Sequence, residues 1–241
     1  MDIRFIRTVS GIVIFLIILF TFILKIDFYF FILIILMIFF DLYKSRILKF
    51  SLSFEYFFII PMLVIMFYLY PSFNSYLLIC FFLSITLSLF VKLKFKNLLF
   101  LFILINFLYF FLLSLNFDRN LIFLVIFISF INDSAAYLFG NLLQGPKILP
   151  SVSPKKTWSG TLISTFISTS ILIFLDYKIL FSIIISFMFF LGDIYFSHIK
   201  RSNQIKDFSN IIPGHGGFLD RLDSIVFPFI LIFMYNYYSI W

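Results

Sequence analysis

Ser197–Asp223 reads SHIKRSNQIKDFSNIIPGHGGFLDRLD and forms a polar island between two long apolar runs at 179–196 and 224–238. Charges near lipid cost free energy, so an island that holds both signs, with glycines between, requires a specific use. Its residue types can hold phosphate through cations and a divalent metal through carboxylates. The charged members are Lys200, Arg201, Lys206, Asp207, Asp220, Arg221 and Asp223.

The composition outside this island is that of a membrane protein. Of 241 residues, 63% are hydrophobic and 12% are charged, whereas a soluble domain is about half apolar and about a quarter charged. Apolar runs recur along the whole length, which excludes a soluble globule with one anchor. Most of the 41 Phe are interpreted as lipid-facing filler. The single Cys80 excludes an intramolecular disulfide.

The apolar runs predict an all-α, polytopic transmembrane helical bundle of about nine spans. We expect one integral membrane domain over 1–241, with N-terminal hydrophobic spans in 1–115 and catalytic spans with cytoplasmic loops in 121–241. The predicted spans are 9–24, 28–40, 56–70, 76–91, 98–115, 121–139, 160–175, 179–196 and 224–238.

Lys and Arg predict the orientation of these spans. With the N-terminus inside, every basic residue except Lys25, Arg119 and Lys178 falls in an inner segment, as the positive-inside rule requires. The C-terminus is then outside. The formal net charge of +7 favours contact with a membrane surface and not with nucleic acid.

Most acids sit at span ends or in loops, where solvated caps are expected, namely Asp2, Asp27, Asp41, Glu55, Asp118 and Asp176. Two other acidic residues lie within apolar runs. Asp133 and Asp193 are each on a span that runs from outside to inside, about 12 and 14 residues from its start. Both are therefore roughly 18–21 Å from the outer boundary, so we expect them to have partners at a shared depth. The structural alternative is an acid that faces Ser or Asn within the bundle.

Further spacings predict a metal site at the inner surface. Asp220 and Asp223, three residues apart at the start of the last span, would share a helical face. Asp193, Ser197 and Lys200 would share a face of the preceding span. Hard oxygen ligands near phosphate favour Mg²⁺ or Mn²⁺.

A glycine-rich turn precedes these last acids. Pro213, Gly214, Gly216 and Gly217 surround His215 and make a bare turn. Such a turn can bring backbone N–H groups against a phosphate.

The loop at 151–159 is the second candidate for holding phosphate. Lys155 and Lys156, with hydroxyls at the start of the next span, would clamp a phosphate. The alternative is a basic anchor that touches anionic lipid at the membrane surface.

These motifs together resemble the signature of the phosphatidate cytidylyltransferase family, also called CDP-diacylglycerol synthases. The resemblance spans residues 133–224, and the N-terminal half is similar only in being hydrophobic. The matching blocks are Asp133-Ser-Ala-Ala-Tyr137, Ser153-Pro-Lys-Lys-Thr157, Gly192-Asp193, Ser197-x-Ile-Lys-Arg201 followed after four residues by Lys206-Asp207, and Pro213-Gly-His-Gly-Gly-Phe-x-Asp-Arg-x-Asp223.

Two motifs depart from the family pattern. Asp133-Ser-Ala-Ala-Tyr137, with Ala135 at its centre, stands where the family has Asp-Thr-Gly-Ala-Tyr, and Ser159 stands where the family has Glu. The acid at Asp133 and the lysines are retained, so we expect the chemistry to remain.

The resemblance implies Mg²⁺-dependent transfer of CMP from CTP to phosphatidate, which gives CDP-diacylglycerol and pyrophosphate in phospholipid biosynthesis. Membrane lipid is a further expected partner, and nucleic acid is not. A second metal ion and a homodimer are left open. The implied location is a bacterial inner (cytoplasmic) membrane, with the site facing the cytoplasm. The implied catalytic residues are Asp193, Lys200, Asp220, Arg221 and Asp223, of which Asp193, Asp220 and Asp223 bind metal; Ser153, Lys155, Lys156, Thr157, Ser197, Arg201, Lys206, His215, Gly216 and Gly217 bind substrate; and Asp133 and Asp207 support them.

Three other readings stay open. A sister enzyme could transfer the same CTP-derived group to another lipid phosphate, because sequence alone does not identify the acceptor. A carrier that uses Asp133 and Asp193 as coupling acids would need paired broken helices in two halves, which the sequence does not show. A purely structural membrane protein would leave four convergent acids without a use.

Overall fold

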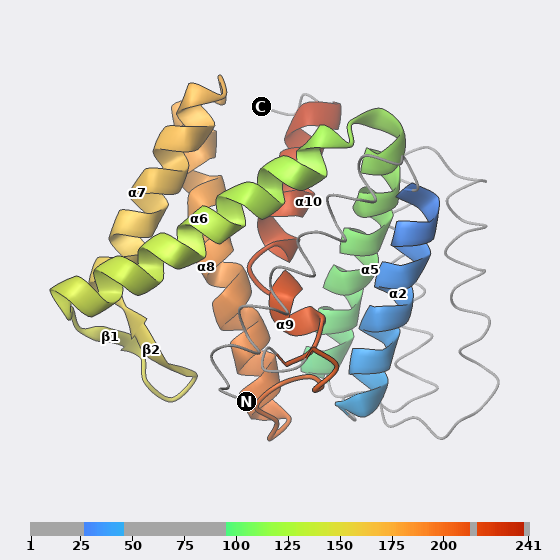
Figure 1. The fold of residues 1–241 in the computed structure, drawn as a ribbon, viewed down its shortest axis with the longest axis horizontal. Helices are drawn as coiled ribbons and strands as arrows, with labels where there is room; N and C mark the ends of the chain where they lie inside the picture. The colour runs from blue at the N-terminus through green and yellow to red at the C-terminus, as the bar shows by residue number, and fades with distance from the viewer. Residues whose placement is uncertain (1–26, 46–94, 213–215, 239–241) are drawn as a thin grey trace, which may run out of the picture. The chain divides into compact units, whose positions relative to one another are not determined.

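A computed structural model describes residues 27–45, 95–212 and 216–238 (Figure 1). The predicted spans at 9–24, 56–70 and 76–91 lie outside the described residues, as do Pro213, Gly214 and His215. The chain divides into two compact units. The first comprises 1–115 with 203–221, and the second comprises 116–202 with 222–241.

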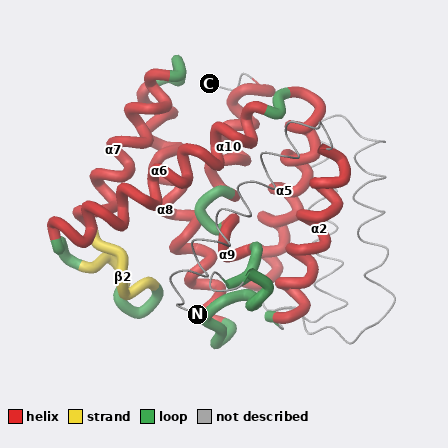
Figure 2. Tube along the Cα trace, viewed as in Figure 1, coloured by secondary structure: helices red, strands yellow, loops and turns green. Residues whose placement is uncertain are grey.

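The described residues are mostly helical, which confirms the coarse prediction of a helical chain. One feature corrects the all-α prediction: a short antiparallel hairpin joins two of the helices (Figure 2). The elements are α2 Asp27–Lys44, α5 Phe95–Phe117, α6 Asn120–Leu143, β1 Lys147–Leu149, β2 Ser153–Thr157, α7 Trp158–Phe174, α8 Ile179–Ser202, α9 Leu219–Leu222 and α10 Val226–Tyr238.

Proline explains why the hairpin is not helical. Pro146, Pro150 and Pro154 recur every four residues, and a proline inside a helix removes a hydrogen bond and clashes with the preceding turn. The chain instead turns back with Lys147 paired to Thr157, and the N–H of Val152 donates to the carbonyl of Leu149 at 3.1 Å. The hairpin therefore places the 153–157 segment on a strand directly before α7.

Two described helices are long and apolar enough to cross a membrane, namely α6 and α8. Leu99–Leu115 within α5, Trp158–Phe174 and Val226–Tyr237 are shorter apolar helices. The helix bounds extend several predicted spans, and α8 continues to Ser202 instead of ending near 196. The charged residues Lys200 and Arg201 are therefore helical. The count of nine spans and their orientation stay predictions.

In the second unit, α7 packs against both α6 and α8, and α10 packs against α8 and α6. Two glycines allow a close crossing of α6 and α7. A Cβ at Gly140 would lie 2.9 Å from the Thr157 hydroxyl, and one at Gly160 would lie 3.0 Å from the Gly140 Cα. Buried polar pairs add to this contact, since the Ser168 hydroxyl donates to Asn132 at 3.1 Å.

In the first unit, the segment Asn203–Arg221 belongs with the described parts of α2 and α5. Burial on α2 follows one face, and α5 is buried along much of its length. Burial of such apolar side chains is the main favourable term in packing. The buried apolar residues of α2 are Ile34, Ile35, Ile38 and Leu42.

The prediction that Asp220 and Asp223 share one helix is wrong. The short helix α9 ends at Leu222, Asp223 lies in the following turn, and α10 begins at Val226. Pro228 gives the physical reason, because proline lacks an N–H and is tolerated in the first turn of a helix but not in its interior. A helix that continued from α9 would place Pro228 in the interior.

Candidate active site

The C-terminal half of α8 carries the first part of the candidate site. As the spacing of four predicts, the Ser197 hydroxyl donates to Oδ1 of Asp193 at 3.3 Å. Lys200, one turn further, is 7% exposed. A buried ammonium is costly unless it is paired, and its Nζ lies 3.8 Å from Oδ2 of Asp223. The three residues therefore line one face of α8, as predicted.

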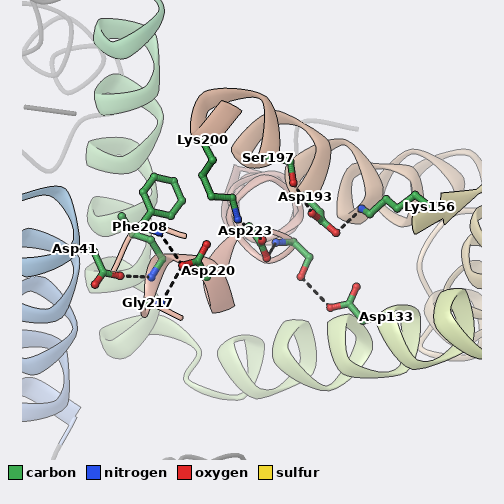
Figure 3. A network of polar contacts seen from close by, with 12 residues as sticks. Asp41, Asp133, Lys156, Asp193, Ser197, Lys200, Phe208, Gly217, Asp220 and Asp223 are labelled. Atoms are coloured by element: carbon green, nitrogen blue, oxygen red, sulfur yellow. Dashed lines mark hydrogen bonds and ion pairs between the residues drawn. The ribbon is translucent and has the colours of Figure 1, made fainter. Parts of the chain in front are cut away.

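The hairpin supplies a cation to the same face. Lys156 on β2 forms an ion pair with Asp193 (Figure 3). Its Nζ also lies over the Phe190 ring, 5.3 Å from the centroid, within the range of a cation–π interaction. Phe190 is buried beside the cation, unlike the lipid-facing role expected for most Phe. The loop predicted to clamp phosphate is thus tied to the acid of α8.

Asp223 receives a cation and a backbone donor. Besides Lys200, the N–H of Ser224 donates to its Oδ1 at 2.9 Å. Burial raises the pKa of Asp223 well above its usual value, and the nearby carboxylate of Asp193 raises it further, whereas Lys200 lowers it. The two acids are therefore close enough to repel each other when both are ionised. A divalent cation would relieve that repulsion.

Ser224 links Asp133 to this group and was missed by the sequence reasoning. Its hydroxyl donates to Oδ2 of Asp133 at 3.3 Å, and its oxygen lies 2.8 Å from the Ser129 hydroxyl. Asp133 therefore acquires a hydroxyl partner, which is the arrangement that the structural alternative described. No sequence signal distinguishes Ser224 from any serine at the start of a span.

Asp220 has different partners, within the first unit. Its Oδ2 accepts the backbone N–H groups of Phe208 and Gly217, each at 2.9 Å (Figure 3). Gly216 has a φ of +83°, a conformation that glycine adopts without strain. The N–H of Gly217, which the sequence predicts to face a phosphate, thus donates to Asp220 in this structure.

The remaining predicted residues are placed as follows. The Thr157 hydroxyl caps α7 by accepting the N–H of Gly160 at 3.3 Å. Ser159, the departure from the family's Glu, accepts the N–H of Gly145 at 3.2 Å and so ties the base of the hairpin. Ala135 is buried in α6. The side chains of Lys155, Arg201, Lys206, Asp207 and Arg221 are exposed, and Ser153 is half-buried.

Hard oxygen donors that fit Mg²⁺ are present on Asp193 and Asp223. Mg²⁺ is usually held by one or two carboxylates, with waters and substrate phosphates completing the shell. The two carboxylates repel each other when both are ionised, and each now faces an ammonium group at a place that a metal ion could take. Among the described residues, no three Asp, Glu, His or Cys side chains are grouped closely enough to hold a metal. The residues therefore fit a metal held by two carboxylates and by the substrate.

Comparison with known proteins identifies the family. The profile of the Cytidylyltransferase family matches residues 3–240. The chain belongs to the cytidylyltransferase family. The match includes the N-terminal half, which the sequence motifs alone did not connect to the family.

The similar curated proteins are named phosphatidate cytidylyltransferase. One from Rickettsia conorii is 33% identical over 137 residues, which cover 50% of this chain and 60% of the relative. One from Rickettsia bellii is 38% identical over 120 residues, 43% of this chain and 52% of the relative. One from Staphylococcus saprophyticus is 38% identical over 120 residues, 46% of this chain and 45% of the relative. The chain thus spans about half the length of the curated relatives it matches.

Proposed function

We propose that this protein transfers CMP from CTP to phosphatidate and releases pyrophosphate, with Mg²⁺ as cofactor. The single observation that carries this proposal is a cluster of two acids and two lysines beside the C-terminal half of α8: Lys156 of β2 pairs with Asp193, and Lys200 pairs with Asp223 of the turn before α10. Membership of the cytidylyltransferase family supports it. The names of the relatives supply the substrates.

The reaction needs little help from a base. The phosphate of phosphatidate is largely dianionic at pH 7, since the second pKa of a phosphate monoester is about 6. One of its oxygens attacks the α-phosphorus of CTP, a new P–O bond forms, and the bond to the β-phosphate oxygen breaks. Pyrophosphate leaves with that electron pair. We therefore assign His215, which lies outside the described residues, to substrate binding and not to proton transfer.

The protein has to stabilise the negative charge that accumulates around the α-phosphorus in the transition state. Fixed cations that lose little solvation during reaction stabilise such charge efficiently. We propose that Lys156 and Lys200, each already held by a carboxylate, exchange part of that contact for phosphate oxygens. Arg221 and the exposed Lys155, Arg201 and Lys206 would bind the triphosphate or the lipid headgroup.

The metal would be held by Asp193 and Asp223. When bound, Mg²⁺ would neutralise phosphate charge and polarise the P–O bonds. The Ser197 hydroxyl orients Asp193, and the Ser224 N–H orients Asp223. Asp133 supports the group through Ser224. The prediction that Asp220 also binds the metal stays a prediction, as does a supporting role for Asp207.

The position of Asp193 along α8 suits an acceptor that is a membrane lipid. Asp193 is residue 15 of the 24 in α8, so it would lie below the surface of the leaflet and near a lipid headgroup whose chains stay in the bilayer. We propose nine spans, an inside N-terminus and a cytoplasmic site in the bacterial inner membrane. Two apolar helices of spanning length and the Lys/Arg distribution support this.

The first experiment is transfer of label from α-³²P CTP into an organic phase by purified protein in detergent, with phosphatidate, with and without Mg²⁺. We expect labelled lipid only with metal. Asp223→Asn should give none. The matched control is Asp176→Asn, since Asp176 is exposed and has a φ of 65°, a conformation that Asn tolerates. Folded protein that labels a different phospholipid acceptor, and not phosphatidate, would overturn the proposed substrate.

A further inference from the structure

The motif-bearing segment Asn203–Arg221 is held by residues from parts of the chain that carry no motif. Asn97 on α5 exchanges two amide hydrogen bonds with Asn203, at 3.2 and 3.3 Å. The Phe100 ring, also on α5, stacks on Phe208 with centroids 5.7 Å apart and planes 1° from parallel. The start of the segment is therefore fixed to α5.

A carboxylate of α2 holds the middle and the end of this segment. Oδ1 of Asp41 accepts the Ser209 hydroxyl at 2.5 Å, and its Oδ2 accepts the N–H of Leu219 at 2.7 Å. Asp41 is 0% exposed. A buried ionised carboxylate is costly unless hydrogen bonds compensate it. From its place at the end of an apolar run, the sequence predicts a solvated cap, and the structure shows that this prediction is wrong.

The two bonds of Asp41 join two described segments of the chain, 209–212 and 216–219. Ser209 begins the first segment and Leu219 ends the second, so one side chain holds both. The same segments are also joined by the N–H of Ile212, which donates to the carbonyl of Gly216 at 2.9 Å. Gly217 sits directly on Asp41, because a Cβ there would lie 2.9 Å from Cγ and 3.0 Å from Oδ1. The absence of a side chain at Gly217 therefore leaves room for the carboxylate.

We infer that Asp41 is a positioning residue for the reaction: it fixes the backbone of residues 216–219, which include Gly216 and Gly217, against Ser209, and does not itself touch substrate. This inference rests on the proposed function for its activity readout. Because one side chain joins the segments 209–212 and 216–219, removing the carboxylate releases both of them at once.

The experiment compares four variants of the full chain in detergent: Asp41→Ala, Asp41→Asn, Gly217→Ala and, as control on the same helix, the exposed Lys44→Ala. Two quantities are measured, namely kcat and KM in the transfer assay and amide hydrogen exchange of the 207–219 peptide. Exchange does not depend on activity. A wild type without transfer activity would refute the proposed function, and exchange would still decide the role of Asp41.

We expect Asp41→Ala to lower kcat by about tenfold to a hundredfold, the range for loss of hydrogen bonds to a charged group. Exchange should become faster in 207–219 and stay unchanged in α8. Asp41→Asn should recover most of the activity, since its amide oxygen can accept from Leu219 while its NH₂ donates to Ser209. Lys44→Ala should match wild type.

Gly217→Ala should resemble Asp41→Ala because the added methyl displaces the carboxylate. A fifth protein, the double variant Asp41→Ala/Gly217→Ala, should lose less kcat than the product of the two single losses, which indicates direct coupling between the two positions. Unchanged exchange and kcat in Asp41→Ala would overturn the inference. Faster exchange throughout the chain, with Asn no better than Ala, would also overturn it. If Asp41→Ala is not recovered folded, Gly217→Ala provides the same test.

Discussion

Two pairs of carboxylates in this chain have the same chemistry and opposite partners. Asp193 and Asp223 face ammonium groups, at Lys156 and Lys200. Asp41 and Asp220 accept mainly backbone N–H groups and a hydroxyl. A carboxylate paired with a lysine side chain can exchange that ammonium group for a metal ion. One that accepts fixed N–H groups instead determines the path of the backbone.

The structure gives different roles to Asp220 and Asp223, which their spacing in the sequence had predicted to share one role. Asp220 and Asp223 stand three residues apart in the signature and were predicted to act together. In the structure they follow different elements, the first in α9 and the second in the turn before α10. Asp220 accepts backbone N–H groups and so holds the chain in place. Asp223 faces the ammonium group of Lys200 and so can bind a cation.

The largest effect is expected at Asp223. Asp223→Asn removes the charge that Lys200 and a metal would share, so turnover should fall by about a thousandfold or more, as for other groups that act on transition-state charge. Steady-state transfer of label from CTP measures it. Asp176→Asn should remain at the wild-type rate. Turnover within tenfold of wild type in a folded Asp223→Asn would remove this residue from the proposed metal site.

Asp220 gives the sharpest test of the comparison. If Asp220 organises the backbone, Asp220→Asn should keep most activity, because an amide oxygen can still accept from Phe208 and Gly217. Asp220→Ala should lose about tenfold to a hundredfold, since two buried N–H groups are left without their acceptor. If Asp220 binds metal instead, Asn and Ala should be equally inactive, and raising Mg²⁺ should partly rescue Asn. The ratio of the two kcat values decides between these roles.

How much was visible in the sequence depends on whether a signal is local. The spacing of Asp193, Ser197 and Lys200 gave their common face, because helical periodicity is local. Pro228 could have predicted the break between α9 and α10, but it lies within an apolar run that was interpreted as one continuous span. Asp41 could not be found, since its partners are 168 and 178 residues away and an acid at the end of an apolar run has the pattern of a solvated cap.

The hairpin lysines should show an intermediate effect. Lys156→Ala should raise the KM for CTP or phosphatidate by about tenfold, as expected for a charge-assisted hydrogen bond, with a smaller change in kcat. Lys155→Ala should raise KM less, because its side chain is exposed. The control is Lys147→Ala, on the paired strand and also exposed. Equal KM values for the Lys156 and Lys147 variants would return the hairpin to the role of a lipid anchor.

The smallest effect is expected at Ser224, which joins Asp133 to the turn that holds Asp223. Ser224→Ala removes the hydroxyl but keeps the N–H that donates to Asp223. This hydrogen bond to Asp133 is long, at 3.3 Å, and a typical hydrogen bond contributes about 1 kcal/mol, so kcat should fall by about fivefold. Ser170→Ala, whose exposed hydroxyl donates only to the Phe166 carbonyl at 2.9 Å, should have no effect on the rate. If Ser224→Ala were as inactive as Asp223→Asn, Asp133 and its link through Ser224 would belong to the metal site itself. Besides the acids that face cations and those that face the backbone, there would then be a third class, an acid that acts through a hydroxyl group.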